Sequence, residues 1–187
     1  MLGNIMNKSI DAESVVKALI KVVPFVIMLG ALWGMDRYLS RHMLSTTTNS
    51  VAPMFNLVQI DANSIAKQQF PMKSLLGKPT IIYFFAPWCS ICHVSISNLQ
   101  SLYEDEGMDV NVVAIALSYE SDEQVRAFIE DKELTMPVLL GTGMVATEYK
   151  IDAFPSYYVL DSHFNVVERS RGYSTEVGMQ MRLLSLK

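Results

Sequence analysis

The two cysteines of the chain lie close together in the stretch FFAPWCSICHVS, which runs from Phe84 to Ser95. Cys89 and Cys92 are separated by two residues, and His93 directly follows the second cysteine. This spacing is compatible with three kinds of chemistry: a redox pair that exchanges disulfides, half of a zinc site, or an attachment point for a covalent haem. The surrounding sequence has to discriminate among the three.

The redox hypothesis gives the two sulfurs different tasks. The apolar run of residues 80–86 predicts a buried strand, and a helix is expected to begin directly after Cys89. Unpaired N–H groups and the helix dipole stabilise an anion there, and C-x-x-C spacing lowers a cysteine pKa from about 8.5 to roughly 3.5 to 7.5. Cys89 is therefore the expected attacking thiol. Cys92, one turn later and within reach of a disulfide, is expected to resolve the mixed disulfide.

Zinc is poorly supported. A structural site takes four ligands, and besides the two cysteines the chain offers three histidines that are scattered along the sequence, His42, His93 and His163. The haem alternative matches the motif, since Cys89-Ser-Ile-Cys92-His93 is C-x-x-C-H, and twelve methionines offer a second axial ligand. The apolar strand before the motif favours the redox pair. A non-catalytic module that presents a binding groove is a third alternative. We expect no metal and no cofactor besides a redox-active disulfide.

Residues 54–187 alternate between strand and helix patterns. Continuously apolar runs predict buried strands, and apolar residues at helical spacing, such as Ile91, Val94 and Leu99, predict the inward faces of helices. Ser121 with Gln124 three residues later forms a capping box. The order predicts an α/β thioredoxin fold: a mixed central sheet, helices on both faces, and an extra strand and helix inserted before the last hairpin. The expected strands are 80–86, 110–117, 137–140, 156–161 and 165–170, and the expected helices are 90–104, one from 121, 144–149 and 176–186.

The N-terminal part predicts a membrane anchor. The 14 residues 22–35 carry no charge and span about 21 Å as a helix, which is short of a bilayer core of roughly 30 Å. If Lys17 and Lys21 snorkel, the span becomes residues 15–35 and reaches about 31 Å. We expect a tail of residues 1–14, one transmembrane helix of 15–35, a flexible tether of 36–53 and a domain of 54–187. A cleaved signal peptide and a buried helix are the alternatives, and Trp33, at a place where a cleavage site needs a small residue, favours the anchor.

Charge bears on the side of the membrane and on the partners. Three lysines (Lys8, Lys17 and Lys21) precede the uncharged run of residues 22–35 and two arginines (Arg37 and Arg41) follow it, which favours an outer location of the domain. From residue 54 onward, acidic side chains outnumber basic ones by sixteen to ten, a net charge of about −6. Such a domain lacks the basic surface that nucleic-acid binding requires.

Three segments together resemble a known family: LLGKPTIIYFFAPWCSIC, YKIDAFPSYYVLD and GYSTEVGMQMRLL. Over residues 55–187 the chain resembles the membrane-anchored thioredoxin-like thiol-disulfide oxidoreductases of the TlpA/ResA-like branch, which serve respiration and cytochrome maturation. Within that branch it is most similar to the D-type suppressor of copper sensitivity proteins. The resemblance implies a protein disulfide oxidoreductase held on the bacterial inner membrane by one helix, with its domain in the periplasm. It implies protein thiols and disulfides, a membrane redox partner and the lipid bilayer as partners.

The resemblance also implies site residues. Pro155 corresponds to a cis-proline that faces the redox pair, Phe154 to the residue whose backbone pairs with an extended substrate segment, and Trp88 to the aromatic residue beside the first cysteine. Two positions depart from the family pattern. Tyr83 stands where thioredoxins carry a buried carboxylate, and Ser95 stands where the respiratory branch often has a glutamate.

The departures leave proton movement at the resolving thiol to water, Tyr83 or His93, and they leave the redox direction open. The resemblance to copper-sensitivity proteins raises the question whether the chain binds copper. Met179-x-Met181 on the last predicted helix is better explained by core packing, and His42-Met43 is equally weak evidence.

Overall fold

The computed structural model describes residue 20, residues 22–28, 30–31, 34–35, 38, 42–46, 50–62, 68–106 and 109–184, and residue 186. The chain forms two compact units, residues 1–39 and residues 40–187. The described residues between 20 and 38 are helical and exposed. Among the described residues, no helix has the length and apolar character that a bilayer span needs. The expected tail of residues 1–14 lies outside the described residues, as does much of the expected span of 15–35.

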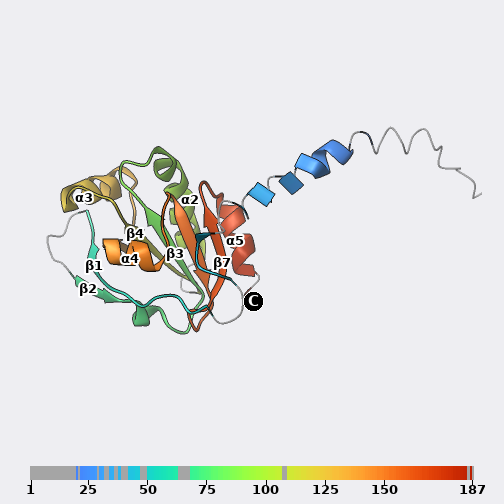
Figure 1. The fold of residues 1–187 in the computed structure, drawn as a ribbon. Helices are drawn as coiled ribbons and strands as arrows, with labels where there is room; N and C mark the ends of the chain where they lie inside the picture. The colour runs from blue at the N-terminus through green and yellow to red at the C-terminus, as the bar shows by residue number, and fades with distance from the viewer. Residues whose placement is uncertain are drawn as a thin grey trace, which may run out of the picture. The chain divides into compact units, whose positions relative to one another are not determined.

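A seven-stranded mixed sheet forms the centre of the second unit (Figure 1). The strand order is β2-β1-β5-β4-β3-β6-β7. β3, β4 and β5 run parallel, whereas β6 and β7 on one side and β1 and β2 on the other are antiparallel to their neighbours. The strands are β1 (Asn56–Ile60), β2 (Gln68–Pro71), β3 (Thr80–Phe85), β4 (Asn111–Ala116), β5 (Val138–Leu140), β6 (Ser156–Leu160) and β7 (Val166–Arg171).

Helices cover both faces of the sheet because its central strands are apolar throughout. Every residue of β3 is buried, and successive side chains of a strand point to opposite faces. Tyr83 thus joins the core formed with α2, α3 and α5, whereas Phe84 joins the core formed with α4 and the 3-10 helix η2. The helices are η2 (Met72–Leu75), α2 (Ser90–Glu106), α3 (Asp122–Asp131), α4 (Gly143–Glu148) and α5 (Glu176–Leu184).

The order of elements confirms the predicted thioredoxin fold. β3, α2, β4, α3, β6, β7 and α5 follow the predicted sequence, and β5 with α4 is the expected insertion before the β6–β7 hairpin. The predicted cap of α3 is also present, since the Gln124 N–H donates to Ser121 Oγ at 3.4 Å. The short strand β2, which pairs with β1 at the edge of the sheet, was not predicted. Its four residues are too few to show a strand period.

The flexible tether expected for residues 36–53 is wrong for residues 42–46 and 50–53, which pack against the domain. Met43 and Ala52 are buried in the core on the α4 side of the sheet. The Met43 carbonyl accepts a hydrogen bond from Arg169 Nη1 at 3.0 Å, and Ala52 N–H donates to the Phe164 carbonyl at 2.8 Å. Because this stretch is polar on average, its sequence pattern did not indicate that Met43 and Ala52 pack into the core.

Candidate active site

Cys89 lies at the junction between β3 and α2. Its N–H donates to the Ala86 carbonyl at 3.0 Å, which closes the turn after the strand, and its carbonyl accepts from the His93 N–H at 3.2 Å. The Cys92 N–H donates to Cys89 Sγ at 3.2 Å. The sulfur thereby accepts from one of the N–H groups that a helix leaves unpaired in its first turn, as a capping side chain does. The predicted placement at a helix N-terminus is confirmed.

The two thiols differ in burial. Both are free, and Cys89 retains 7% of its surface exposed whereas Cys92 retains none. Burial raises the pKa of Cys92, and its hydrogen bond with Cys89 raises it further. Cys92 is therefore a protonated thiol at neutral pH, and Cys89 is the sulfur that a partner in solution can reach.

The helix α2 buries only part of the stripe expected. Ile91 and Val94 are 51% and 62% exposed, so the prediction that they face inward is wrong. The buried face carries Cys92 and Ile96, together with Leu99, for which the inward prediction is confirmed. The helix is turned so that the second cysteine points into the core, and positions four and seven residues later follow it inward.

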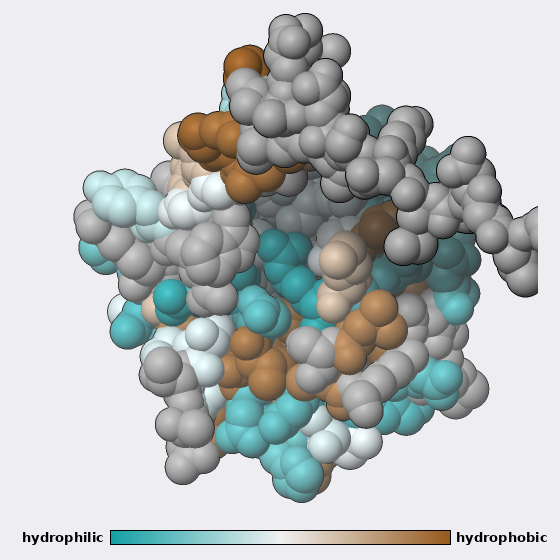
Figure 2. All heavy atoms as spheres, turned by 90° about the vertical axis from the view of Figure 1, so that its right-hand side faces the viewer, coloured by the Kyte–Doolittle hydropathy of each residue, from teal (hydrophilic) through white to brown (hydrophobic). Residues whose placement is uncertain are grey.

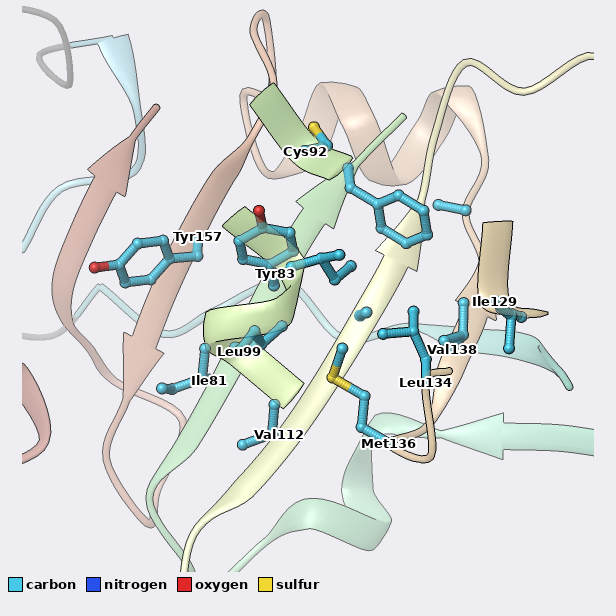
Figure 3. Close-up of a cluster of buried hydrophobic side chains, with 14 of the residues drawn as sticks. Ile81, Tyr83, Cys92, Leu99, Val112, Ile129, Leu134, Met136, Val138 and Tyr157 are labelled. Carbon is cyan, nitrogen blue, oxygen red and sulfur yellow. The ribbon is translucent and has the colours of Figure 1, made fainter. Parts of the chain in front are cut away.

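Tyr83 and Ser95 lie in the same core as Cys92, and both are fully buried. In Figure 3 the Tyr83 ring rises from β3 with its hydroxyl directed toward the side where Cys92 lies. Burial raises the pKa of Tyr83, so the phenol stays protonated and acts as a hydrogen-bond donor. The Ser95 side chain, as a hydrogen-bonding neighbour, partly offsets this rise in the Tyr83 pKa, and within the described part of the chain neither hydroxyl has a partner outside the pair.

Trp88 directly precedes Cys89 in the sequence and contacts Phe154, the residue before Pro155. Trp88 is 60% exposed, its ring meets that of Phe154 edge to face at 5.9 Å, and the Phe154–Pro155 bond is cis. The indole N–H donates to the Ser118 carbonyl at 2.8 Å. Ser118 adopts a left-handed φ of 52° just after β4, and no motif in the sequence pointed to it. The substrate-binding roles of Trp88, Phe154 and Pro155 stay predictions.

His93 points away from the two sulfurs. Its Nε2 lies 2.8 Å from the Pro87 carbonyl oxygen, its Nδ1 lies 3.6 Å from an Asp131 carboxylate oxygen, and its ring packs against Phe128. These groups line an open hollow of about 360 Å³ between α2 and α3.

The residues present do not fit a covalent haem. Cys92 is fully enclosed by the apolar core, and His93 Nε2, the expected axial ligand, is occupied by the Pro87 carbonyl. The hollow beside His93 is not lined by either cysteine.

Metal ligation finds no support in the described residues either, where no group of three or more His, Cys, Asp or Glu side chains is placed to hold an ion. Met179 is fully buried and Met181 is 65% exposed, which confirms core packing for the first and separates the two sulfurs.

Figure 2 shows apolar side chains gathered among polar ones on the face that faces right in Figure 1, where α5 lies.

Residues 48–169 match the model of the AhpC/TSA family. The thioredoxin-like protein YneN of Bacillus subtilis (strain 168) is 24% identical over 153 residues, which cover 81% of this chain and 87% of YneN. The thiol-disulfide oxidoreductase ResA of Oceanobacillus iheyensis is 31% identical over 126 residues, which cover 66% of this chain and 65% of ResA. A solved structure of DsbF from MTB, in mixed oxidized and reduced forms, superposes with a TM-score of 0.63 at 25% identity and covers 73% of this chain and 99% of DsbF.

Proposed function

The chain belongs to the AhpC/TSA family and is a thioredoxin-fold thiol-disulfide oxidoreductase, and we propose that it exchanges disulfides with protein substrates through Cys89 and Cys92. The observation that carries the assignment of roles is the first turn of α2. There the more accessible sulfur accepts the Cys92 N–H, and the second sulfur lies behind it in the core. No bound cofactor takes part, since the cysteine pair itself holds the two electrons.

In the first step, the Cys89 thiolate attacks one sulfur of a substrate disulfide. A bond forms between Cys89 and that sulfur, the substrate S–S bond breaks, and the other substrate sulfur leaves as a thiolate that takes a proton. The backbone N–H of Cys92 stabilises the attacking thiolate because it already points at the sulfur.

In the second step, Cys92 loses its proton and attacks Cys89 in the mixed disulfide. The Cys89–Cys92 bond forms, the substrate is released as a thiol, and the substrate disulfide has been reduced by two electrons at the expense of the cysteine pair. The reverse sequence oxidises a substrate dithiol. The residue pair between the cysteines, Ser90-Ile91, does not set the potential, so the direction follows from the redox partner.

The substrate-binding surface that we propose surrounds Cys89. Trp88 supplies an exposed, oriented aromatic face, and Phe154 and Pro155 form the adjoining wall. An extended segment of a substrate protein would lie along this wall with its sulfur beside Cys89. The substrates that we propose are periplasmic protein thiols, in cytochrome maturation or copper tolerance.

We further propose that residues 15–35 tether the protein to the bacterial inner membrane and that the domain works in the periplasm. The apolar run and the excess of lysines before it support this orientation. A membrane redox partner would then recycle the cysteine pair. Extraction of cell membranes with alkaline carbonate should leave the protein in the pellet, and its release into the soluble fraction would contradict the tether.

The function is tested with two variants and a model disulfide, oxidised glutathione. Cys89→Ser should abolish exchange, and Cys92→Ser should form a mixed disulfide at Cys89 that is not resolved, visible by intact-protein mass spectrometry. Exchange at an unaltered rate in Cys89→Ser would refute the assignment of Cys89 as the attacking thiol, and no exchange by the wild type would favour a non-catalytic binding module. A redox titration against glutathione then gives the direction: about −270 mV suits a reductant and about −120 mV an oxidant.

A further inference from the structure

Two buried hydroxyl groups beside the redox pair have no part in the steps described so far. Tyr83 Oη and Ser95 Oγ are fully enclosed and lie beside each other, and no described residue outside this pair forms a hydrogen bond with either of them. A buried polar group without a partner is costly, and native folds retain few of them. A hydrogen bond between the two hydroxyls uses only one of their two O–H donors, so a donor is left over for an acceptor that appears during the reaction.

The position of the two hydroxyls identifies that acceptor. Ser95 follows Cys92 by three residues on the same buried face of α2, and Tyr83 faces the same core from β3. Burial raises the pKa of Tyr83, and negative charge on Cys92 or Cys89 raises it further, as expected of a phenol close to both sulfurs. Figure 3 shows the phenol directed toward the side of the cluster where Cys92 lies.

The other candidate groups around Cys92 are engaged elsewhere. Tyr157 on β6 stacks on the Tyr83 ring at 6.4 Å, but its hydroxyl accepts a hydrogen bond from Arg182 on α5 at 2.7 Å. The cation of Arg182 thus faces Tyr157. His93 on α2 is directed to Pro87 and to Asp131 at the end of α3.

Building on the proposed function, we propose that the Tyr83 and Ser95 hydroxyls are hydrogen-bond donors reserved for the Cys92 thiolate that forms when the mixed disulfide is resolved. A neutral thiol is a weak acceptor, so in the dithiol state the hydroxyls have no partner besides each other. A thiolate is a strong acceptor, and O–H donors already in place stabilise it where water is excluded.

The proton and electron balance is the same in both directions. In reduction of a substrate, Cys92 gives up its proton, which ends on the departing substrate thiolate, and the sulfur then attacks Cys89. In oxidation of a substrate, a substrate thiolate attacks Cys89 and Cys92 leaves as a thiolate. Both routes pass through the charged Cys92 sulfur, so Tyr83 and Ser95 act in either direction.

The test separates the two steps of the reaction. Reduced full-length protein is mixed with oxidised glutathione, quenched at intervals, and analysed by intact mass, which resolves the dithiol, the mixed disulfide and the internal disulfide. Tyr83→Phe and Ser95→Ala should each slow the conversion of mixed to internal disulfide by about tenfold. The pH at which that conversion is half-maximal should rise by about one unit, because loss of a donor raises the pKa of Cys92. The formation of the mixed disulfide at Cys89 should be unchanged.

Tyr157→Phe is the matched control, because it removes a phenol from the neighbouring ring whose hydroxyl is paired with Arg182. This variant should leave the conversion and its pH profile as in the wild type. Thermal unfolding of each variant is recorded alongside, since a purely structural role would move the melting temperature without moving the pH profile. If Tyr83→Phe fails to fold, Ser95→Ala carries the test.

Two outcomes are decisive and differ from each other. A double variant of Tyr83 and Ser95 that resolves the mixed disulfide with wild-type rate and pH dependence would overturn the reserved-donor role. A wild-type protein that forms no mixed disulfide at Cys89 would overturn the proposed function instead, whatever the hydroxyl variants do.

Discussion

Trp88 is an exposed aromatic side chain whose polar edge is held by a hydrogen bond. The indole N–H bonds the Ser118 carbonyl, and the ring rests against Phe154, so the exposed face has a fixed orientation. A rigid, exposed aromatic group next to a reactive sulfur is suited to bind a protein chain, since immobilising it on binding costs little entropy.

Trp88→Ala is therefore expected to lower kcat/KM for a disulfide-containing protein such as insulin by about tenfold. Exchange with oxidised glutathione, which is too small to need this surface, should change much less. Steady-state kinetics with both substrates measure the difference. Leu76→Ala is the control, because Leu76 is equally exposed, at 60%, in the turn after η2. An equal loss with both substrates would point to a change at Cys89 rather than to substrate binding.

The position of Cys89 at the start of a helix was predictable from the sequence, whereas the surroundings of the two cysteines were predictable only in part. A two-residue spacing after an apolar strand sets the order of burial, because a helix that begins at Ser90 turns Cys92 inward. How close Tyr83 and Ser95 come to Cys92 depends on how α2 packs across β3, which the sequence pattern does not show. The predicted buried stripe of α2 was displaced by one residue at its start, so Ile91 and Val94 were wrongly expected to face inward.

The end of β5 is packed so closely against β4 that Gly141 has no space for a side chain. A methyl group there would lie 2.6 Å from the Leu117 side chain and 2.7 Å from the Ala116 carbonyl oxygen. Gly141→Ala should lower the free energy of unfolding by about 1–3 kcal/mol, measured by urea denaturation. Gly143→Ala, at the start of α4, adds its methyl group to open space and should cost nothing. Equal stability of the two variants would contradict this packing.

The turn between β6 and β7 is held by one carboxylate. Asp161 Oδ1 accepts from the His163 and Asn165 N–H groups at 2.9 and 2.8 Å, and Oδ2 accepts from the Asn165 amide at 2.8 Å. Partial burial alone would raise the pKa of Asp161, but these hydrogen bonds outweigh it and hold the pKa below the ordinary value of 3.8.

Asp161→Ala should cost about 1–2 kcal/mol of stability near neutral pH. Because the folded pKa is lowered, the contribution is complete above pH 3.8 and is lost as the pH falls through the folded value. Urea denaturation from pH 2 to 6 should therefore show the two proteins converging at low pH. Asp161→Asn keeps an acceptor oxygen but cannot titrate, so it should lose less stability and show less dependence on pH. A gap between wild type and Asp161→Ala that stays constant down to pH 2 would disprove the contribution of the carboxylate.

Most helices and strands followed from periodicity, and the exceptions have physical reasons. Long apolar runs such as that of β3 indicate strands buried on both faces, and such strands lie in the middle of a sheet. The edge strand β2 has no buried residue, so its four residues carry no hydrophobic pattern to find. The stretch of residues 42–53 is polar on average, and the two buried side chains that fasten it, Met43 and Ala52, are spaced too far apart to form a pattern.

Residues 42–46 and 50–53 pack against the domain and are part of it, and the strength of this packing can be measured. Met43 is 3% exposed, and its neighbour Leu44 donates its N–H to the Tyr158 hydroxyl at 2.9 Å. Met43→Ala should lower the free energy of unfolding of the full-length protein by about 2 kcal/mol, because it leaves a cavity beside β7. Met54→Ala, where the side chain is 55% exposed, should have little effect. Stability unaffected by Met43→Ala would restore the tether hypothesis for this stretch.

The division of labour between the two thiols is tested most directly by measuring each one's reactivity in the reduced protein. A short pulse of iodoacetamide at neutral pH, followed by peptide mass spectrometry, quantifies the alkylation of Cys89 and Cys92 separately. The accessible sulfur at the start of α2 should be labelled at least about tenfold faster than the buried, protonated one behind it. Labelling of Cys92 at the same rate as Cys89, or before it, would contradict the assignment of attacker and resolver.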